Sequence, residues 1–180
     1  MKVLFVVPYP EGTAPSQRFR FEQYFPALAE RGIQYEVHTF LDRGTWAILY
    51  KPGHTLQKAG GILKGFARRI GLLFRVPGFD VVFLHREASP IGPPVFEWFI
   101  GQVLRKKIIY DFDDAIWLPN TSDTNKLAAG LKWHQKVGRI CGWAWKVSCG
   151  NRYLQEYALQ FNPQAIVNPP RLTRSTCTTR

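Results

Sequence analysis

Six short apolar runs, separated by longer segments of helical pattern, constrain the fold more than any other feature of this sequence. The first run, Lys2–Val7, is continuously apolar and ends at a proline, which is typical of a strand buried on both faces of a parallel sheet. Strands that alternate with helices predict an α/β fold with a Rossmann-like, doubly wound parallel sheet. The other five runs are Tyr35–Phe40, Val81–Leu84, Ile108–Tyr110, Lys146–Cys149 and Ala165–Val167.

The segment after the first strand predicts a helix that begins at Ser16 and ends at Gly32. Serine is a favourable N-cap residue, and glycine commonly ends a helix. Phe21 and Phe25 share one face of this helix, which would pack on the sheet. Because proline cannot continue a helix interior, Pro26 is expected to kink this helix or to split it.

Residues 43–79 combine a basic pattern with an apolar one. Apolar residues recur at helical spacing, which predicts an amphipathic basic helix or helix pair interrupted at Gly60-Gly61. The segment contains no acidic residue, in a chain whose formal net charge is +11. Such a local excess indicates an anionic partner, which could be a membrane surface, a phosphate-bearing substrate or nucleic acid. The basic residues are Arg43, Lys51, Lys58, Lys64, Arg68, Arg69 and Arg75.

The number of cysteines and the hydropathy of the chain indicate the cellular compartment that the sequence fits. Cys141, Cys149 and Cys177 are odd in number and lack metal-ligand spacing, so neither a disulfide framework nor a zinc site is predicted. The apolar run at the start is too short for a signal peptide, and no run approaches the roughly 20 residues of a membrane span. These features favour a cytoplasmic protein. No nucleic-acid-binding motif accompanies the positive charge, so no nucleic-acid partner is expected.

Ligands of open parallel sheets bind beyond the carboxyl ends of the strands, so the loops that follow the strands are the first candidates for a site. The loop after the first strand contains Gly12 and leads to Arg18 and Arg20. Backbone amides and arginines in this place can receive an anion, although a simple turn with solvated arginines is the alternative. A single glycine is not a dinucleotide-binding fingerprint, so a Rossmann cofactor is not predicted.

A histidine follows the third strand. The imidazole of His85 could position a hydroxyl or a phosphate by hydrogen bonding, with Glu87 orienting the ring. The alternative is a structural histidine that caps the next helix.

Three carboxylates follow the fourth strand. Asp111, Asp113 and Asp114 lie so close together that they need a cation, hydrogen-bond donors or water. Along an extended chain, Asp111 and Asp113 point to the same side and Asp114 to the opposite one. This pair could hold a metal ion, accept hydrogen bonds from sugar hydroxyls or act as a base.

In their order and spacing, these segments resemble the N-terminal domain of the retaining GT-B glycosyltransferases of family four. The likeness covers residues 1–169, which would form one domain, the acceptor-side half of a GT-B fold. It includes Gly12 in the first loop and a final strand and turn that would lead into a second domain. The stretches that carry it are Lys2–Pro8, Phe21–Gly32, Phe79–His85, Ile108–Asp114, Lys146–Leu154 and Ala165–Pro169.

The resemblance implies transfer of a sugar from a nucleotide-sugar donor to a glycan or lipid-linked acceptor, without a cofactor or a required metal. Asp113 and His85 would face the cleft as catalytic residues, although many members carry His where this chain has Asp113. Gly12 and Arg18 would lie near the donor phosphates. The residues expected to bind substrate are Gly12, Arg18, Asp111, Asp114 and Glu87.

The same resemblance implies two partners. The donor nucleotide is held mainly by a C-terminal domain that is missing here, so the chain alone is expected to be inactive. Several members of the fold dock on membranes through their N-terminal half, which would place residues 43–79 on the anionic inner face of a membrane. Residues 170–180 are rich in Thr and Arg and are expected to be a disordered or aberrant tail.

Two other classes remain open. The stretch from Tyr110 to Asp114 also looks like the first motif of haloacid-dehalogenase-type phosphatases, with Asp111 as nucleophile and Asp113 as acid. It departs from that motif at Asp114 and Ala115, where the family has Gly and Thr. An Asp-x-Asp sequence after a strand is also similar to the metal-binding motif of GT-A enzymes, which would make the protein a metal-dependent transferase.

Overall fold

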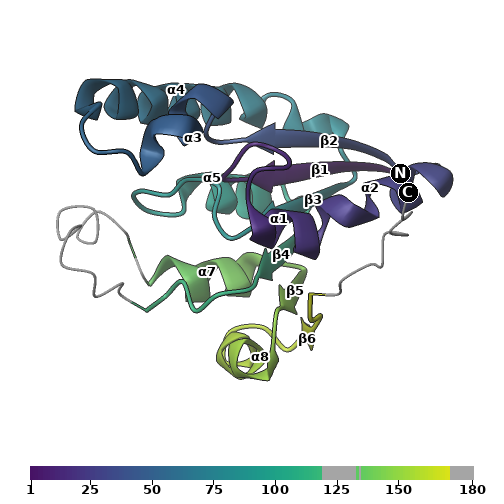
Figure 1. The fold of residues 1–180 in the computed structure, drawn as a ribbon. Coiled ribbons are helices and arrows are strands. Elements are labelled where there is room, and N and C mark those ends of the chain that lie inside the picture. Colours follow the sequence, from purple (N-terminus) through teal and green to yellow (C-terminus); the bar gives the residue numbers. More distant parts are fainter. Residues whose placement is uncertain (119–132, 134, 171–180) are drawn as a thin grey trace, which may run out of the picture.

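A six-stranded, all-parallel sheet forms the centre of the molecule in the computed structural model, which describes residues 1–118, 133 and 135–170 (Figure 1). The strand order is β2-β1-β3-β4-β5-β6, which confirms the predicted α/β, Rossmann-like class. Each expected strand is present with bounds within two residues of the prediction. The strands are β1 (Lys2–Val7), β2 (Gln34–Thr39), β3 (Val81–His85), β4 (Lys107–Phe112), β5 (Lys146–Cys149) and β6 (Ala165–Val167).

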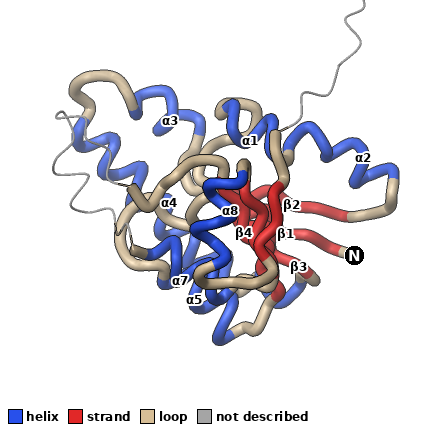
Figure 2. Tube along the Cα trace, turned by 90° about the horizontal axis from the view of Figure 1, so that it is seen from below, coloured by secondary structure: helices blue, strands red, loops and turns tan. Residues whose placement is uncertain are grey.

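Helices cover the two faces of the sheet unequally. The larger core lies on the face where α4, α5, α7 and α8 pack, and Figure 2 shows α5 and α7 beside each other. The other face carries α1 and α2 over β1 and β3. The helical segments are α1 (Pro15–Arg20), η1 (Glu22–Tyr24), α2 (Phe25–Glu30), α3 (Arg43–Leu49), α4 (Thr55–Leu73), η2 (Val76–Gly78), α5 (Val95–Trp98), η3 (Phe99–Val103), α7 (Lys136–Trp143) and α8 (Arg152–Leu159).

The side chains of β4, which alternate between the two faces of the sheet, show that one face is covered better than the other. Ile108, Tyr110 and Phe112 point to the larger core and are no more than 1% exposed. Ile109 points to the other face and is only half-buried, like Val81 of β3. A groove of about 910 Å³ runs along that face and is lined mainly by apolar side chains. A parallel sheet normally has both faces covered, and this groove is the place where the residues described by the structure leave the sheet without a covering layer.

The helix after β1 begins at a different residue from the one predicted, but it is split as predicted. Ala14, with φ −101° and ψ 125°, is the N-cap residue, and Ser16 lies inside α1. The expected N-cap role of Ser16 is therefore wrong. The predicted split is confirmed, because α1 ends at Arg20 and α2 starts at Phe25 with Pro26 in its first turn, where proline is tolerated.

The basic segment forms α3 and α4, and α4 continues through Gly60 and Gly61 without interruption. The glycine pair therefore does not interrupt the helix as predicted. Gly61 faces α3 so closely that a Cβ atom there would lie 2.3 Å from Oγ1 of Thr45. Glycine is used at this position because the two helices contact each other, not because the helix ends.

No helix in the described part of the chain is both long and apolar enough to cross a membrane. Of the expected tail, residues 171–180 lie outside the described residues.

Candidate functional site

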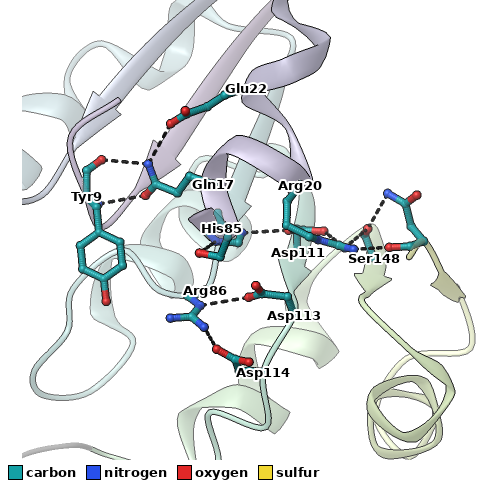
Figure 3. Close-up of polar contacts among 12 residues, drawn as sticks. Tyr9, Gln17, Arg20, Glu22, His85, Arg86, Asp111, Asp113, Asp114 and Ser148 are labelled. Atoms are coloured by element: carbon teal, nitrogen blue, oxygen red, sulfur yellow. Dashed lines mark hydrogen bonds and ion pairs between the residues drawn. The ribbon is translucent and has the colours of Figure 1, made fainter. Parts of the chain in front are cut away.

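The strand order reverses at β1, which has β2 on one side and β3 on the other. In doubly wound sheets the crevice at this reversal, beyond the carboxyl ends of the strands, is the usual ligand site. The side chains that follow β1, β3 and β4 gather at this edge (Figure 3). They form two layers, a buried polar network and a partly exposed group of charges.

Arg20 and Asp111 form the centre of the buried network. Their side chains are each 1% exposed, and Nε of Arg20 donates to Oδ2 of Asp111 at 3.2 Å while Nη2 donates to Oδ1. Arg20 also donates to Oγ of Ser148 at 3.1 Å and to the carbonyl oxygen of Asn168. One guanidinium thus ties α1 to β4, to β5 and to the chain after β6.

The environment of Asp111 keeps it ionised. Burial alone would raise the pKa of this carboxyl, but hydrogen bonds from His85 and Arg20 outweigh burial and lower the pKa below its ordinary value. Because both carboxylate oxygens are bonded inside the protein, Asp111 does not offer a free oxygen to a ligand. The structure thus places Asp111, which was expected to bind substrate, inside the buried network, and its contact with a substrate stays a prediction.

His85 lies between the network and α1. Its Nδ1 contacts Oδ2 of Asp111 at 2.8 Å, and its Nε2 contacts Oγ of Ser16 at 3.4 Å. The side chain is 0% exposed. The parallel register places His85 of β3 directly beside Asp111 of β4 on the same face of the sheet. His85 was expected to face the cleft, but it reaches this edge only through the half-buried Ser16.

Glu87 does not orient His85 as expected. Its carboxylate pairs instead with Nζ of Lys136 in α7, at 2.5 Å. Lys136 also donates to the carbonyl oxygen of Ser89 at 2.8 Å, so the pair joins α7 to the loop after β3. Glu87 has a structural partner, and the orienting carboxylate of His85 is Asp111.

Arg86 follows β3 in a backbone conformation that is rare for a residue with a side chain. Its φ is 60°, and the amide of Glu87 donates across it to the carbonyl oxygen of His85 at 2.8 Å. Such tight turns with positive φ are strained and occur mostly where the surrounding structure needs a side chain at one position. The turn directs the guanidinium of Arg86 toward the carboxylates that follow β4 (Figure 3).

Asp113 and Asp114 both bind Arg86. Nε of Arg86 donates to Oδ1 of Asp113 at 3.1 Å, and Nη2 pairs with Oδ2 of Asp114. The prediction that these two carboxylates point to opposite sides is wrong, because β4 ends at Phe112 and the extended alternation ends with it. Burial would lower the pKa of Arg86, but Asp113 and Tyr9 raise it, so this arginine stays charged.

The loop after β1 is fastened to its own helix. Gly12 has a φ of +78°, and its amide donates to Oε2 of Glu22 at 3.1 Å. Gln17, which is fully buried, donates to the carbonyl oxygen of Tyr9 and accepts from the amide of Tyr9. The amide of Gly12 is thus already bonded to a carboxylate. Arg18 is exposed and is not among the residues that meet at this edge.

An aromatic group begins in the same loop as the carboxylates, three residues after Asp114. Trp117, in the loop after β4, stacks on Tyr157 with ring centroids 3.7 Å apart and on Tyr153 at 6.0 Å. Tyr153 lies in the first turn of α8 and is 57% exposed. Aromatic rings next to carboxylates suit a polyhydroxylated ligand, because sugar rings stack on aromatic faces while their hydroxyls bond to acids and arginine.

The described residues contain no group of three or more His, Cys, Asp or Glu side chains arranged to hold a metal ion. No protein-family model matches the chain, and no curated protein matches it. The structure therefore defines the class of the protein by itself, as an α/β protein with a Rossmann-like parallel sheet and a polar site at the switch point of that sheet.

The sequence indicated His85, Asp111, Asp113 and Asp114 but not the side chains that they contact. Ser16 was expected to cap a helix, Arg20 was expected to pair with a bound anion rather than with Asp111, and Arg86 was given no role. The signal that could have found Arg86 is its position next to His85 at the end of a buried strand, directly beside the acidic end of the next strand.

Proposed function

We propose that this chain is the N-terminal, acceptor-side domain of a retaining GT-B glycosyltransferase of family four, and that it acts on a glycan or lipid-linked acceptor in the cytoplasm. The observation that carries the proposal is the group of Arg86, Asp113 and Asp114 at the switch point, in a loop that continues to Trp117, whose ring stacks on the exposed ring of Tyr153. Charged and aromatic groups at this edge fit the hydroxyls and the ring face of a sugar.

For this function, Asp113 is the residue of the site that is best placed to act in catalysis. Its side chain is 18% exposed and its Oδ1 is bonded to Arg86, so its carboxylate is held in place while it can still be reached. Asp114, with a side chain 65% exposed, would accept hydrogen bonds from acceptor hydroxyls. Gly12 and Arg18 would come near the donor phosphates only when a nucleotide sugar is held over the first loop.

The part of this sheet face that the described residues leave open supports the existence of a second unit. The groove along β1, β3 and β4 exposes Val81, Phe83 and Ile109 in part. A helix from a nucleotide-binding domain would complete this layer and bring the donor to the site. The nucleotide sugar is therefore the expected co-substrate of the complete enzyme, with no cofactor built into this half.

Binding and turnover, measured separately, test this function. Saturation-transfer NMR with a panel of mono- and oligosaccharides should detect binding to the purified chain, and Asp114→Ala should reduce it. The matched control is Glu11→Ala, which removes an exposed carboxylate from the first loop. Turnover of a sugar nucleotide by the chain alone would contradict the expectation that it needs a second domain, and failure to bind any sugar would remove the acceptor role.

The outward face of α4 supports a peripheral association with a membrane. Exposed apolar side chains are Leu56, Leu63 and Ile70 of α4 and Phe74 directly after it, each between 55% and 88% exposed. Lys64 lies among them with a side chain 67% exposed. An apolar stripe with flanking cations is suited to the headgroup region of an anionic leaflet. Co-sedimentation with vesicles that contain phosphatidylglycerol should exceed that with neutral vesicles, and Leu63→Glu should abolish the difference. Equal sedimentation with both would remove this part of the proposal.

The structure disfavours the two alternative classes that begin with Asp111. A phosphatase nucleophile or a metal ligand needs a free carboxylate oxygen, and both oxygens of Asp111 are bonded to Arg20 and His85 in a site that is 1% exposed. Phosphatase activity lost in Asp111→Asn, or sugar-nucleotide binding that requires Mn²⁺, would restore the respective alternative.

A further inference from the structure

Three polar side chains contact one another in succession at the switch point of the sheet. They are Ser16, His85 and Asp111, and together they are called the row below. Oγ of Ser16 lies 3.4 Å from Nε2 of His85, and Nδ1 of the same ring lies 2.8 Å from Oδ2 of Asp111. A hydroxyl, an imidazole and a buried carboxylate in this order are the groups by which serine hydrolases activate their nucleophile. The first distance is long for a hydrogen bond, as is common in sites without a ligand.

The proton positions follow from the chemistry of the three groups. An ionised carboxylate can only accept, so Nδ1 of His85 carries a proton that it donates to Asp111. In the neutral ring, Nε2 is then a bare acceptor that faces the hydroxyl of Ser16. The ring of Phe21 packs edge-on against His85, with centroids 5.3 Å apart, and helps to hold this orientation.

Arg20 distinguishes this row from a simple hydrogen-bonded histidine. Arg20 binds both oxygens of Asp111 and keeps the carboxylate charged and fixed, so Asp111 cannot take the proton from His85. His85 and Asp111 are shielded from solvent, at 0% and 1% exposure. Ser16 is half-buried, so it is the member of the row that a small molecule can reach.

We propose that Ser16 is a nucleophilic serine, with His85 as its base and Asp111 as the carboxylate that positions His85, and that it reacts with the acyl or phosphoryl centre of activated esters. In this step Oγ bonds to the electrophilic carbon or phosphorus, and the hydroxyl proton moves to Nε2. The bond to the leaving group breaks, and an alkoxide leaving group takes the proton from His85. This reactivity uses neither a sugar nucleotide nor a second domain.

A fluorophosphonate probe tests the proposal on the chain as it exists. Oγ displaces fluoride from phosphorus, and the probe remains on the serine. Mass spectrometry of the intact protein should show one adduct, which peptide mapping should place on Ser16. Ser16→Ala should remove it. Ser148→Ala, which deletes another hydroxyl of the same network that touches Arg20 but not His85, should leave it unchanged.

His85→Gln measures the contribution of the base. This variant can keep a hydrogen bond to Asp111 but cannot take a proton, so labelling should slow by about a hundredfold or more. Absence of an adduct on wild-type Ser16, or labelling of His85→Gln at the wild-type rate, would overturn the proposal.

Unfolded wild-type protein gives a readout that does not depend on how His85→Gln folds. In urea, the row is dispersed and Ser16 becomes an ordinary serine, so the adduct should not form. Equal labelling rates in urea and in buffer would also overturn the proposal. Because no sugar takes part, these results are independent of the acceptor-binding experiments.

Discussion

Arg20 joins more parts of the site than any other side chain described. It contacts Asp111, Ser148 and the carbonyl oxygen of Asn168, which belong to three separate segments. We expect Arg20→Ala to lower the free energy of unfolding by about 3–5 kcal/mol, because it leaves a buried carboxylate without its cation. Urea denaturation measures this change.

Arg18→Ala is the matched control for Arg20→Ala. It removes the same side chain from the same short helix, two residues earlier, at an exposed position. Its effect on the free energy of unfolding should stay within about 0.5 kcal/mol. Similar losses in both variants would mean that the buried pair contributes no more than a surface arginine.

His38 makes stability depend on pH. Burial and the nearby charge of Arg69 lower the pKa of His38 to about 4 from its ordinary 6.5. Nη1 of Arg69 lies 2.6 Å from Nδ1 of His38, which is its acceptor only while the imidazole is neutral. Below pH 6.5 the unfolded chain takes up a proton that the folded chain resists, so the free energy of unfolding should fall as pH falls toward about 4.

A comparison with His38→Asn isolates this contribution. The amide oxygen of Asn can accept from Arg69 but does not titrate. The loss of unfolding free energy between about pH 7 and about pH 5 should be larger for the wild type than for the variant. Parallel curves for the two proteins would show that His38 is not responsible.

At the residue scale, the sequence indicated which strand ends carry polar side chains, but it did not indicate which of these side chains contact one another. His85 and Asp111 are 26 residues apart and become neighbours only through the register of β3 and β4. Arg20 is 91 residues from Asp111, so its role depends on how α1 packs over the sheet. No local pattern encodes such a contact, which is why Arg20 was expected to pair with a bound anion and Glu87 was assigned to the wrong partner.

At the scale of elements, α4 shows how packing overrides local propensity. Gly60 and Gly61 predicted a break, yet α4 runs through both because α3 lies against Gly61. We expect Gly61→Ala to destabilise the fold by about 1–3 kcal/mol, since its new methyl group would overlap the side chain of Thr45. Thermal or urea unfolding measures the loss.

At the neighbouring position, Gly60→Ala is expected to have the opposite effect on stability. A Cβ atom at Gly60 meets nothing within 4 Å. Alanine has the higher helix propensity, so this variant should be neutral or more stable by up to about 1 kcal/mol. If Gly61→Ala were tolerated equally well, the close contact between α3 and α4 would not be present in solution.

At the scale of the whole molecule, the positions of the strands were predictable because each strand is a short apolar run whose length and flanks are local properties. The unequal cover of the two faces was not predictable in this way. Every crossover after β2 runs in the same direction along the sheet, so right-handed connections place α4, α5, α7 and α8 on one face. Among the described residues, only the helices between β1 and β2 pack on the other face.

Two adjacent isoleucines of β4 test this asymmetry. Ile108 is 1% exposed in the larger core, and Ile109 lines the groove on the other face and is half-buried. Ile108→Ala should lower the free energy of unfolding by about 2–5 kcal/mol, because it leaves a cavity in a packed core. Ile109→Ala should cost about 1 kcal/mol or less, since it removes surface that was never fully withdrawn from water.

A hydrophobic dye gives the complementary measurement for the same groove. The wild-type chain should enhance the fluorescence of an anilinonaphthalene sulfonate, because part of the apolar lining around Ile109 is accessible. Ile109→Ser should weaken this signal, whereas Leu63→Ser on the far helix α4 should leave the contribution of the groove intact. Equal costs for the two alanine variants, together with no dye binding, would mean that another layer already covers this face. A concentration series by analytical ultracentrifugation would then show whether that layer is a second copy of the chain.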